Sequence, residues 1–198
     1  MPTLVIVAGP NGSGKTTLVR SGVLADVMNI PAVSINADDV ASEIAAGGQP
    51  SPEQSLQAAR ISDARLDEEI AAGRSVVVET VLSSDKYKRR LLMAHAAGFR
   101  VVLVYVTVRI AELNVARVAT RLRMGGHDVP LERIIARRTR SHQMFTWFAH
   151  EADLVFVFDN STTAPTIVAF KERNEWTLRD LDMLAPDLAD ALRSIAGS

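Results

Sequence analysis

Residues 4–17 read Leu4-Val5-Ile6-Val7-Ala8-Gly9-Pro10-Asn11-Gly12-Ser13-Gly14-Lys15-Thr16-Thr17, and this stretch decides how the chain folds. It begins with a short apolar run, and the residues after that run match the pattern G-x-x-x-x-G-K-[ST] and lead directly into a helical pattern. An apolar strand, a glycine-rich turn and a helix in this order predict a P-loop, the phosphate-binding loop of an α/β protein.

Each part of this loop has an expected role. Gly12 and Gly14 can adopt backbone angles closed to other residues, so that successive N–H groups point at a phosphate. Lys15 is expected to reach the β- and γ-phosphates of ATP, and the Thr16 hydroxyl is expected to bind Mg²⁺. The alternative is a glycine-rich turn that fits by chance, against which the flanking strand and helix argue. The predicted nucleotide-binding residues are Gly9, Pro10, Asn11, Gly12, Ser13, Gly14, Lys15, Thr16 and Thr17.

Composition limits the classes of protein to consider. The 198 residues include 22 Lys and Arg against 23 Asp and Glu, and this balance speaks against nucleic acid as a partner, although a local basic patch would suffice for one. The chain has no cysteine, which excludes disulfides and thiolate metal sites. No apolar segment reaches the ~18 residues of a membrane span, and the first apolar run is too short for a signal peptide. We therefore expect a cytoplasmic protein that does not bind membranes.

Short apolar runs alternate with longer helical patterns, which is typical of a three-layer α/β fold. We expect one P-loop kinase domain over residues 1–198, with a five-stranded, mainly parallel sheet and helices on both faces. Thr166 to Phe170, with Trp176 after it, is a candidate extra edge strand, and residues 180–195 are expected to form a terminal helix. The five expected strands are Leu4 to Ala8, Ala32 to Ile35, Ser75 to Glu79, Arg100 to Val106 and Asp153 to Phe158. The other expected helices are Lys15 to Ala25, Ser51 to Ala72, Lys86 to Ala97, Ala111 to Arg123 and Leu131 to Phe148.

Acidic residues follow two of the expected strands. Ligands of open α/β sheets lie beyond the carboxyl ends of the strands, so Asp38 and Asp39 are expected to face the same crevice as the P-loop. An aspartate there is placed to take the proton of an acceptor hydroxyl; position favours Asp38, with Asp39 as the competing base or as a helix N-cap. Glu79, at the tip of the third strand, is expected to hold the Mg²⁺ shell or to bind the acceptor, and Thr80 and Ser83 follow it as weaker candidates.

Arginines are frequent between residues 117 and 140. Arg117 and Arg121 share one helical face, while Arg133, Arg137 and Arg140 share another, and a glycine-containing turn separates the two faces. Two basic helical faces around a turn predict a lid at about residues 121–140, whose guanidinium groups neutralise charge on a triphosphate. For any single arginine, a solvated helix face is the alternative.

Taken in order, these motifs resemble the zeta toxin family of P-loop kinases. The resemblance implies an ATP-dependent kinase fold in which Asp38 is the base that activates a sugar hydroxyl. It implies that Glu79 and Thr80 contact the acceptor, and that Arg121 with Arg137 or Arg140 clamps the phosphates. The resemblance rests on the segments 8–17, Ile35-Asn36-Ala37-Asp38-Asp39, Glu79-Thr80, Gly125-Gly126-His127-Asp128-Val129-Pro130 with the arginines after it, and Asp159-Asn160-Ser161.

Residue roles follow from the motifs and the resemblance together. The expected catalytic residues are Lys15, Asp38, Arg121 and Arg137. The expected metal-binding residues are Thr16 and Glu79. The expected substrate-binding residues are Asn36, Asp39, Glu79, Thr80, Arg117 and Arg140.

Family members phosphorylate UDP-N-acetylglucosamine, and a small antitoxin protein occludes their nucleotide site. We therefore expect an ATP- and Mg²⁺-dependent kinase that acts on a small-molecule hydroxyl, with a nucleotide-sugar as the implied acceptor and an antitoxin as the implied partner. Two alternatives remain open. One is a kinase of nucleotides, sugars or polynucleotide ends, and the other is a non-catalytic module in which ATP orders the lid.

Overall fold

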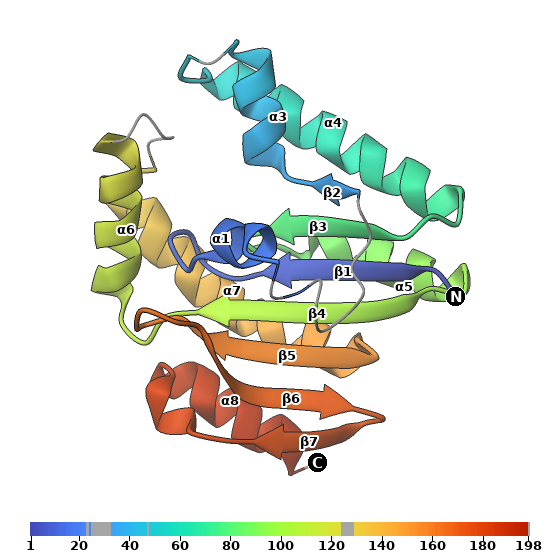
Figure 1. Ribbon diagram of the computed structural model, residues 1–198, viewed down its shortest axis with the longest axis vertical. Helices are drawn as coiled ribbons and strands as arrows, with labels where there is room; N and C mark the ends of the chain where they lie inside the picture. Colours follow the sequence, from blue (N-terminus) through green and yellow to red (C-terminus); the bar gives the residue numbers. More distant parts are fainter. Residues whose placement is uncertain (23, 25–32, 47, 124–128, 198) are drawn as a thin grey trace.

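A seven-stranded sheet organises the computed structural model, which describes residues 1–22, 24, 33–46, 48–123 and 129–197 (Figure 1). The strand order is β2-β3-β1-β4-β5-β6-β7, with the first five strands parallel and the last two antiparallel to their neighbours. The strands are β1 (Thr3–Ala8), β2 (Ser34–Ile35), β3 (Val76–Thr80), β4 (Arg100–Thr107), β5 (Leu154–Asp159), β6 (Thr166–Glu172) and β7 (Glu175–Leu178).

The expected number of five strands is wrong by two. The candidate edge strand that begins at Thr166 is present as β6, and a further strand, β7, pairs with it. The turn between them contains Arg173 and Asn174, both with positive φ (53° and 64°). Two-residue hairpin turns of this kind usually carry glycine, so the sequence signal for the hairpin was weak.

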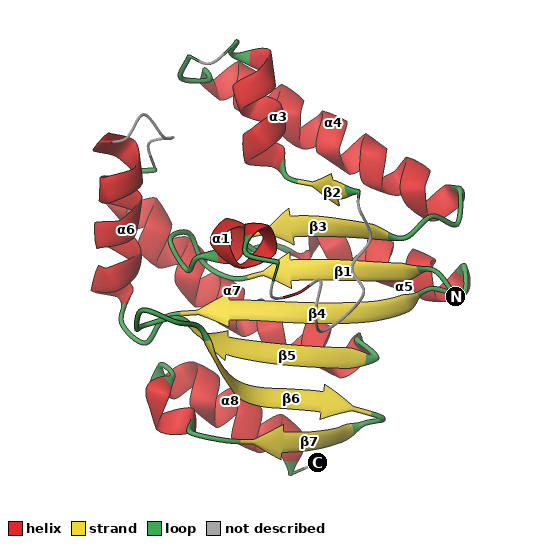
Figure 2. Cartoon of the chain, in the orientation of Figure 1, coloured by secondary structure: helices red, strands yellow, loops and turns green. Residues whose placement is uncertain are grey.

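Helices cover both faces of the sheet, which confirms the expected three-layer α/β fold (Figure 2). Leu4 and Ile6 of β1 pack in a core with residues of α4, α5, α7 and α8, whereas Val5 and Val7 pack in a core with Leu18 of α1. The helices are α1 (Lys15–Arg20), α3 (Ala37–Ile44), α4 (Pro52–Ala71), α5 (Lys88–Ala96), α6 (Ala111–Arg123), α7 (Leu131–Glu151) and α8 (Pro186–Ala196), with short 3₁₀ helices η1 (Asp85–Tyr87) and η2 (Leu181–Met183).

The parallel strands bring the predicted motifs to one edge of the sheet. β1, β2 and β3 all end at this edge, where α3 and α6 also lie (Figure 1). In the register of β1 and β3, Val7 pairs with Glu79 and Ala8 with Thr80, so the acidic tip of β3 lies beside the start of the P-loop. Within the described residues, we find no helix with the length and apolar character needed to cross a membrane. Residues 23, 25, 32 and 125–128 lie outside the described part; they belong to the expected first helix, second strand and lid turn.

Candidate active site

The P-loop joins β1 to α1, and its backbone leaves no room for a side chain at Gly12 or Gly14. Gly12 and Gly14 have φ values of 72° and 98°, in the left-handed region that L side chains rarely adopt. A Cβ atom on Gly12 would lie 2.5 Å from the main-chain carbonyl oxygen of Asn114, and one on Gly14 would collide with the side-chain amide of Asn160. The loop is therefore packed closely between α6 and the segment after β5.

Lys15 lies folded over this loop. Its ammonium group donates hydrogen bonds to the carbonyl oxygens of Gly9 (2.8 Å) and Pro10 (3.0 Å). Burial lowers the pKa of Lys15 to about 8, although the carboxylates of Glu79 and Asp38 act in the opposite direction. The group is thus still mainly protonated at neutral pH and is placed to meet an anionic ligand at the loop.

Thr16 and Glu79 place two side-chain oxygen atoms next to each other. The Thr16 hydroxyl donates a 2.8 Å hydrogen bond to Glu79 Oε2, and Glu79 is buried. Burial raises the pKa of Glu79, against the effects of the Thr16 hydrogen bond and the Lys15 charge. Mg²⁺ in phosphoryl-transfer sites takes one or two protein oxygens together with phosphate oxygens and water. These two side chains fit that requirement, so Thr16 and Glu79 are the residues that would hold the ion.

The two neighbouring aspartates after β2 lie in different surroundings. Asn36, and not Asp39, is the N-cap of α3, because its side-chain oxygen accepts a hydrogen bond from the Asp38 N–H (2.9 Å). The Asp38 side chain lines the cavity described below, where its Oδ2 lies 3.8 Å from Arg121 Nη1. Asp39 instead pairs with Arg20 at 3.2 Å, and both partners are largely exposed.

The fold places some arginines of α6 and α7 at the cavity and leaves others outside it. Arg117 and Arg121 of α6 and Arg137 of α7 line the cavity. Burial lowers the pKa of Arg137, and the nearby charges of Arg133 and Arg140 lower it further. Arg140 is exposed and is not part of the cavity wall. The sequence pattern that grouped Arg137 with Arg140 therefore joins one residue of the site to one outside it.

A cavity of about 870 Å³ brings most of the predicted residues together. The predicted residues that line it are Asn11, Gly12, Gly14, Lys15, Thr16, Thr17, Asn36, Asp38, Glu79, Thr80, Arg117, Arg121 and Arg137. The predicted residues that do not line it are Gly9, Pro10, Ser13, Asp39 and Arg140.

One wall of the cavity comes from residues that sequence reasoning missed or weighted weakly. Beyond Thr80, the wall includes Leu82, Ser83, Lys86 and Tyr87. Leu82 is buried with a positive φ of 55°, and its N–H donates to Thr80 Oγ1 (3.1 Å). The one available signal was position, since this segment follows the carboxyl end of a parallel strand.

Two asparagines that hold the P-loop form a second group of additional residues. The Asn114 side chain donates to the carbonyl oxygen of Asn11 (2.7 Å), and the Asn160 side chain donates to that of Ser13 (2.8 Å). Asn114 was not singled out in the sequence, whereas Asn160 belongs to a quoted motif. Asn160 also lines a second cavity of about 660 Å³, which shares Gly14, Thr17 and Arg117 with the first.

Comparison with known proteins gives a family and one relative for this chain. The family model AAA_33, described as an AAA domain, matches residues 4–143. A protein of Haemophilus influenzae, named only as an uncharacterized protein, is 31% identical over 141 residues, which cover 63% of this chain and 84% of that protein.

Solved structures share the fold at low sequence identity. A chain from the PezAT chromosomal toxin-antitoxin system of Streptococcus pneumoniae superposes with a TM-score of 0.66 at 16% identity, covering 100% of this chain and 85% of that chain. A chain of the AvrRxo1-ORF1:-ORF2 complex with ATP superposes with a TM-score of 0.69 at 18% identity. That match covers 99% of this chain but 64% of the longer AvrRxo1 complex chain. The zeta-toxin-like P-loop kinase fold expected from the sequence is thereby confirmed, and the chain belongs to the AAA_33 family of AAA domains.

Proposed function

We propose that this protein is an ATP-dependent kinase that transfers the γ-phosphoryl group to a hydroxyl of a small molecule. The observation that carries the proposal is the arrangement around one cavity. Lys15, Thr16 and Glu79 line it, and Asp38 of α3 lies 3.8 Å from Arg121 of α6. Residues 1–198 would act as one kinase domain, with α6 and α7 as the arginine-bearing lid.

The chemistry assigns one task to each group. Lys15 and the P-loop N–H groups hold the β- and γ-phosphates. Thr16 and Glu79 would hold Mg²⁺, which when bound would neutralise charge on the phosphate oxygens. Asp38 accepts the proton of the acceptor hydroxyl. As the proton leaves, the hydroxyl oxygen forms a bond to the γ-phosphorus, and the bond from the γ-phosphorus to the oxygen of the β-phosphate breaks. ADP and the phosphorylated acceptor are the products.

Arg121 and Arg137 supply the charge that this transfer needs. The transferred group spreads negative charge over its oxygens, and guanidinium groups brought against it lower the barrier. The 3.8 Å approach of Arg121 to Asp38 keeps a lid arginine close to the expected base. The same charges would also attract an anionic acceptor to the cavity.

A nucleotide-sugar such as UDP-N-acetylglucosamine is the acceptor we propose to test first. The cavity wall after β3 offers hydroxyls, a lysine and a tyrosine ring, which are groups suited to a polar, anionic sugar derivative. The fold shared with a chain of a toxin-antitoxin system supports an antitoxin as a partner that covers this cavity. We propose the cytoplasm as its location, where ATP is available.

The test uses ATP labelled in the γ-phosphoryl group, Mg²⁺ and separate acceptors: nucleotide-sugars, free sugars, nucleosides and oligonucleotides. Label should pass to a small-molecule hydroxyl. The Asp38→Asn variant should lose roughly 10²- to 10⁴-fold in rate, as expected for a general base. Asp39→Asn is the matched control, since Asp39 faces Arg20 outside the cavity. Tight ATP binding with no labelled acceptor, and with Asp38→Asn behaving like wild type, would favour a nucleotide-switched binding module instead.

A further inference from the structure

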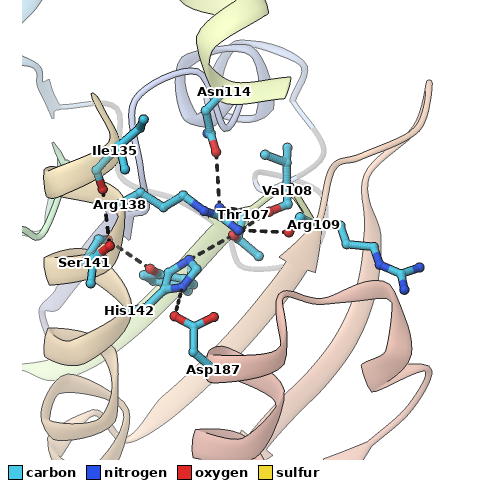
Figure 3. Close-up of polar contacts among 11 residues, drawn as sticks. Thr107, Val108, Arg109, Asn114, Ile135, Arg138, Ser141, His142 and Asp187 are labelled. Carbon is cyan, nitrogen blue, oxygen red and sulfur yellow. Dashed lines mark hydrogen bonds and ion pairs between the residues drawn. The ribbon is translucent and has the colours of Figure 1, made fainter. Parts of the chain in front are cut away.

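Arg138 of α7 is a buried arginine that does not line the cavity. It is 7% exposed, and its guanidinium group lies between Val108, Arg109 and Asn114 (Figure 3). Nη1 donates to the Val108 carbonyl oxygen (2.9 Å) and to Asn114 Oδ1 (3.1 Å), and Nη2 donates to the Arg109 carbonyl oxygen (2.9 Å). One side chain thus binds both the segment after β4 and the first turn of α6.

The acceptors of Arg138 are neutral. Within the part of the chain that the structure describes, no carboxylate lies within ion-pair distance of this guanidinium, although Asp187 and Glu112 act on it from further away. Burial lowers the pKa of Arg138. A buried charge without a direct counter-charge is costly to keep, so its hydrogen bonds must hold the group firmly.

Asn114 links Arg138 to the P-loop through hydrogen bonds. The residue is fully buried, and its Nδ2 donates to the Asn11 carbonyl oxygen at 2.7 Å. Arginine can only donate, so the Asn114 oxygen must face Arg138 and its NH₂ group must face the loop. The amide orientation is therefore fixed by its two neighbours, and only a side chain with both an acceptor and a donor can replace it.

The loop is held by asparagines from two sides. Asn114 binds the carbonyl oxygen of Asn11, and Asn160 binds that of Ser13. A peptide carbonyl fixed to the outside of a turn turns the adjoining N–H groups toward its inside. This is the arrangement that a phosphate-binding loop requires.

Arg138 also neighbours a residue of the proposed active site. Arg137 lines the cavity, while Arg138, one position along α7, points into the protein. A helix that is fastened by Arg138 to the β4–α6 connection thereby presents Arg137 at a fixed place relative to the P-loop.

We propose that Arg138, acting through Asn114, is a positioning residue. It holds the P-loop in its nucleotide-binding shape and at a fixed position relative to α6 and α7. The proposal rests on the proposed function only in treating the P-loop as an ATP site, because it concerns ATP affinity and not the acceptor. Loss of the Asn114 hydrogen bond should release the Asn11 carbonyl, and the loop would then pay an ordering cost each time ATP binds.

The experiment compares two changes at Asn114. Asn114→Asp keeps an acceptor for Arg138 but cannot donate to Asn11, and Asn114→Leu removes both contacts without adding charge. Arg138→Lys keeps the charge but cannot reproduce the forked donation. The matched control is Arg89→Met, which removes an exposed arginine of α5 that lies outside both cavities. Each protein is titrated with Mg-ATP by calorimetry below its measured unfolding temperature.

We expect both Asn114 variants to bind Mg-ATP about three- to tenfold more weakly, the range expected for one lost hydrogen bond. Asn114→Asp should unfold at a higher temperature than Asn114→Leu, because its carboxylate still accepts from Arg138. Arg138→Lys should weaken ATP binding in the same direction, and Arg89→Met should bind as wild type does.

Three results would overturn the proposal. Unchanged ATP affinity in folded variants with lowered unfolding temperatures would show a purely structural role. A loss confined to Asn114→Asp would show an effect of charge on the phosphates. A wild type that binds no Mg-ATP would remove both this proposal and the proposed function, whereas a wild type that binds ATP without phosphorylating any acceptor would remove the proposed function alone. If Asn114→Leu does not fold, Asn114→Asp and Arg138→Lys decide the question.

Discussion

The Thr16 hydroxyl donates a 2.8 Å hydrogen bond to Glu79 Oε2, so the first turn of α1 and the last part of β3 present adjacent oxygen atoms to one cavity. Neither residue is near the other in sequence. The parallel pairing of β1 with β3 brings them together, because it places Glu79 beside Val7 just before the loop begins.

The pairing of Thr16 with Glu79 predicts how ATP binding depends on the Mg²⁺ concentration. Thr16→Val and Glu79→Gln should each raise the Mg²⁺ concentration needed for tight ATP binding by roughly ten- to hundredfold, as seen when groups around a metal are removed. Thr16→Ser should restore most of the loss because it returns the hydroxyl. Titration of ATP binding against Mg²⁺ measures this, and identical Mg²⁺ requirements in all four proteins would exclude the pair as the metal site.

Lys15 predicts a pH dependence of ATP binding. The pKa of Lys15 is lowered to about 8 in the free protein, and bound phosphates favour its charged form. Affinity should therefore be nearly constant below that pKa and should fall by up to about tenfold per pH unit above it. Lys15→Arg should bind ATP with no such slope, because a guanidinium stays protonated. Calorimetry across this range checks the prediction, and a flat wild-type profile would contradict it.

The placement of the arginines predicts unequal effects along α7. Arg137 lines the cavity and Arg140 does not. Arg137→Ala should lower the phosphoryl-transfer rate by roughly 10³-fold or more, the range of arginines that stabilise a transferring phosphoryl group. Arg140→Ala should have a much smaller effect. Steady-state kinetics at saturating ATP separate the two, and equal losses would show that the lid closes into a different arrangement.

His142 and Asp187 predict how stability changes with pH. His142 Nδ1 lies 2.7 Å from Asp187 Oδ2, its Nε2 lies 3.5 Å from Thr107 Oγ1, and the charge of Arg138 is nearby. Burial lowers the pKa of His142 from 6.5 despite the Asp187 carboxylate, and the hydrogen bond and charge of His142 lower the pKa of Asp187 against its burial. The folded state thus binds fewer protons than the unfolded state below pH 6.5.

The free energy of unfolding should accordingly be highest above that pH and should fall as the pH drops through the folded pKa of His142, with a further loss where Asp187 titrates. His142→Asn should show a smaller loss between pH 7.5 and pH 5.5, measured by urea unfolding at both values. A variant with the same or a larger loss than wild type would assign the acid sensitivity to other groups.

The sequence was sufficient to locate the motifs that are marked by residue type and by position at the ends of strands. The P-loop, Glu79 and Asp38 all lie at carboxyl ends of parallel strands, a relationship that apolar periodicity and spacing indicate directly. Which of Asp38 and Asp39 lines the cavity needed the structure, because α3 begins at Ala37 and turns the two neighbours in different directions.

Residues that act on main-chain carbonyl groups were harder to predict. Asn114 and Arg138 contact segments distant in sequence, and backbone acceptors leave no mark on the sequence. A weak signal did exist, since Asn114 shares the buried face of α6 with Val118, and Arg138 shares that of α7 with Ile134 and His142. A polar residue at an apolar position of a helix is a reason to look for its partners.

The proposed kinase activity is tested most directly by mass spectrometry of the acceptor. The acceptor is first incubated with ATP that carries heavy oxygen at every position of its γ-phosphoryl group. The proposed mechanism predicts an acceptor that gains a phosphoryl group whose non-bridging oxygens are all labelled, while its own hydroxyl oxygen forms the bridge, and a rate that collapses in Asp38→Asn. Recovery of the label only as free inorganic phosphate, at the same rate with and without every acceptor and with Asp38→Asn unchanged, would contradict it.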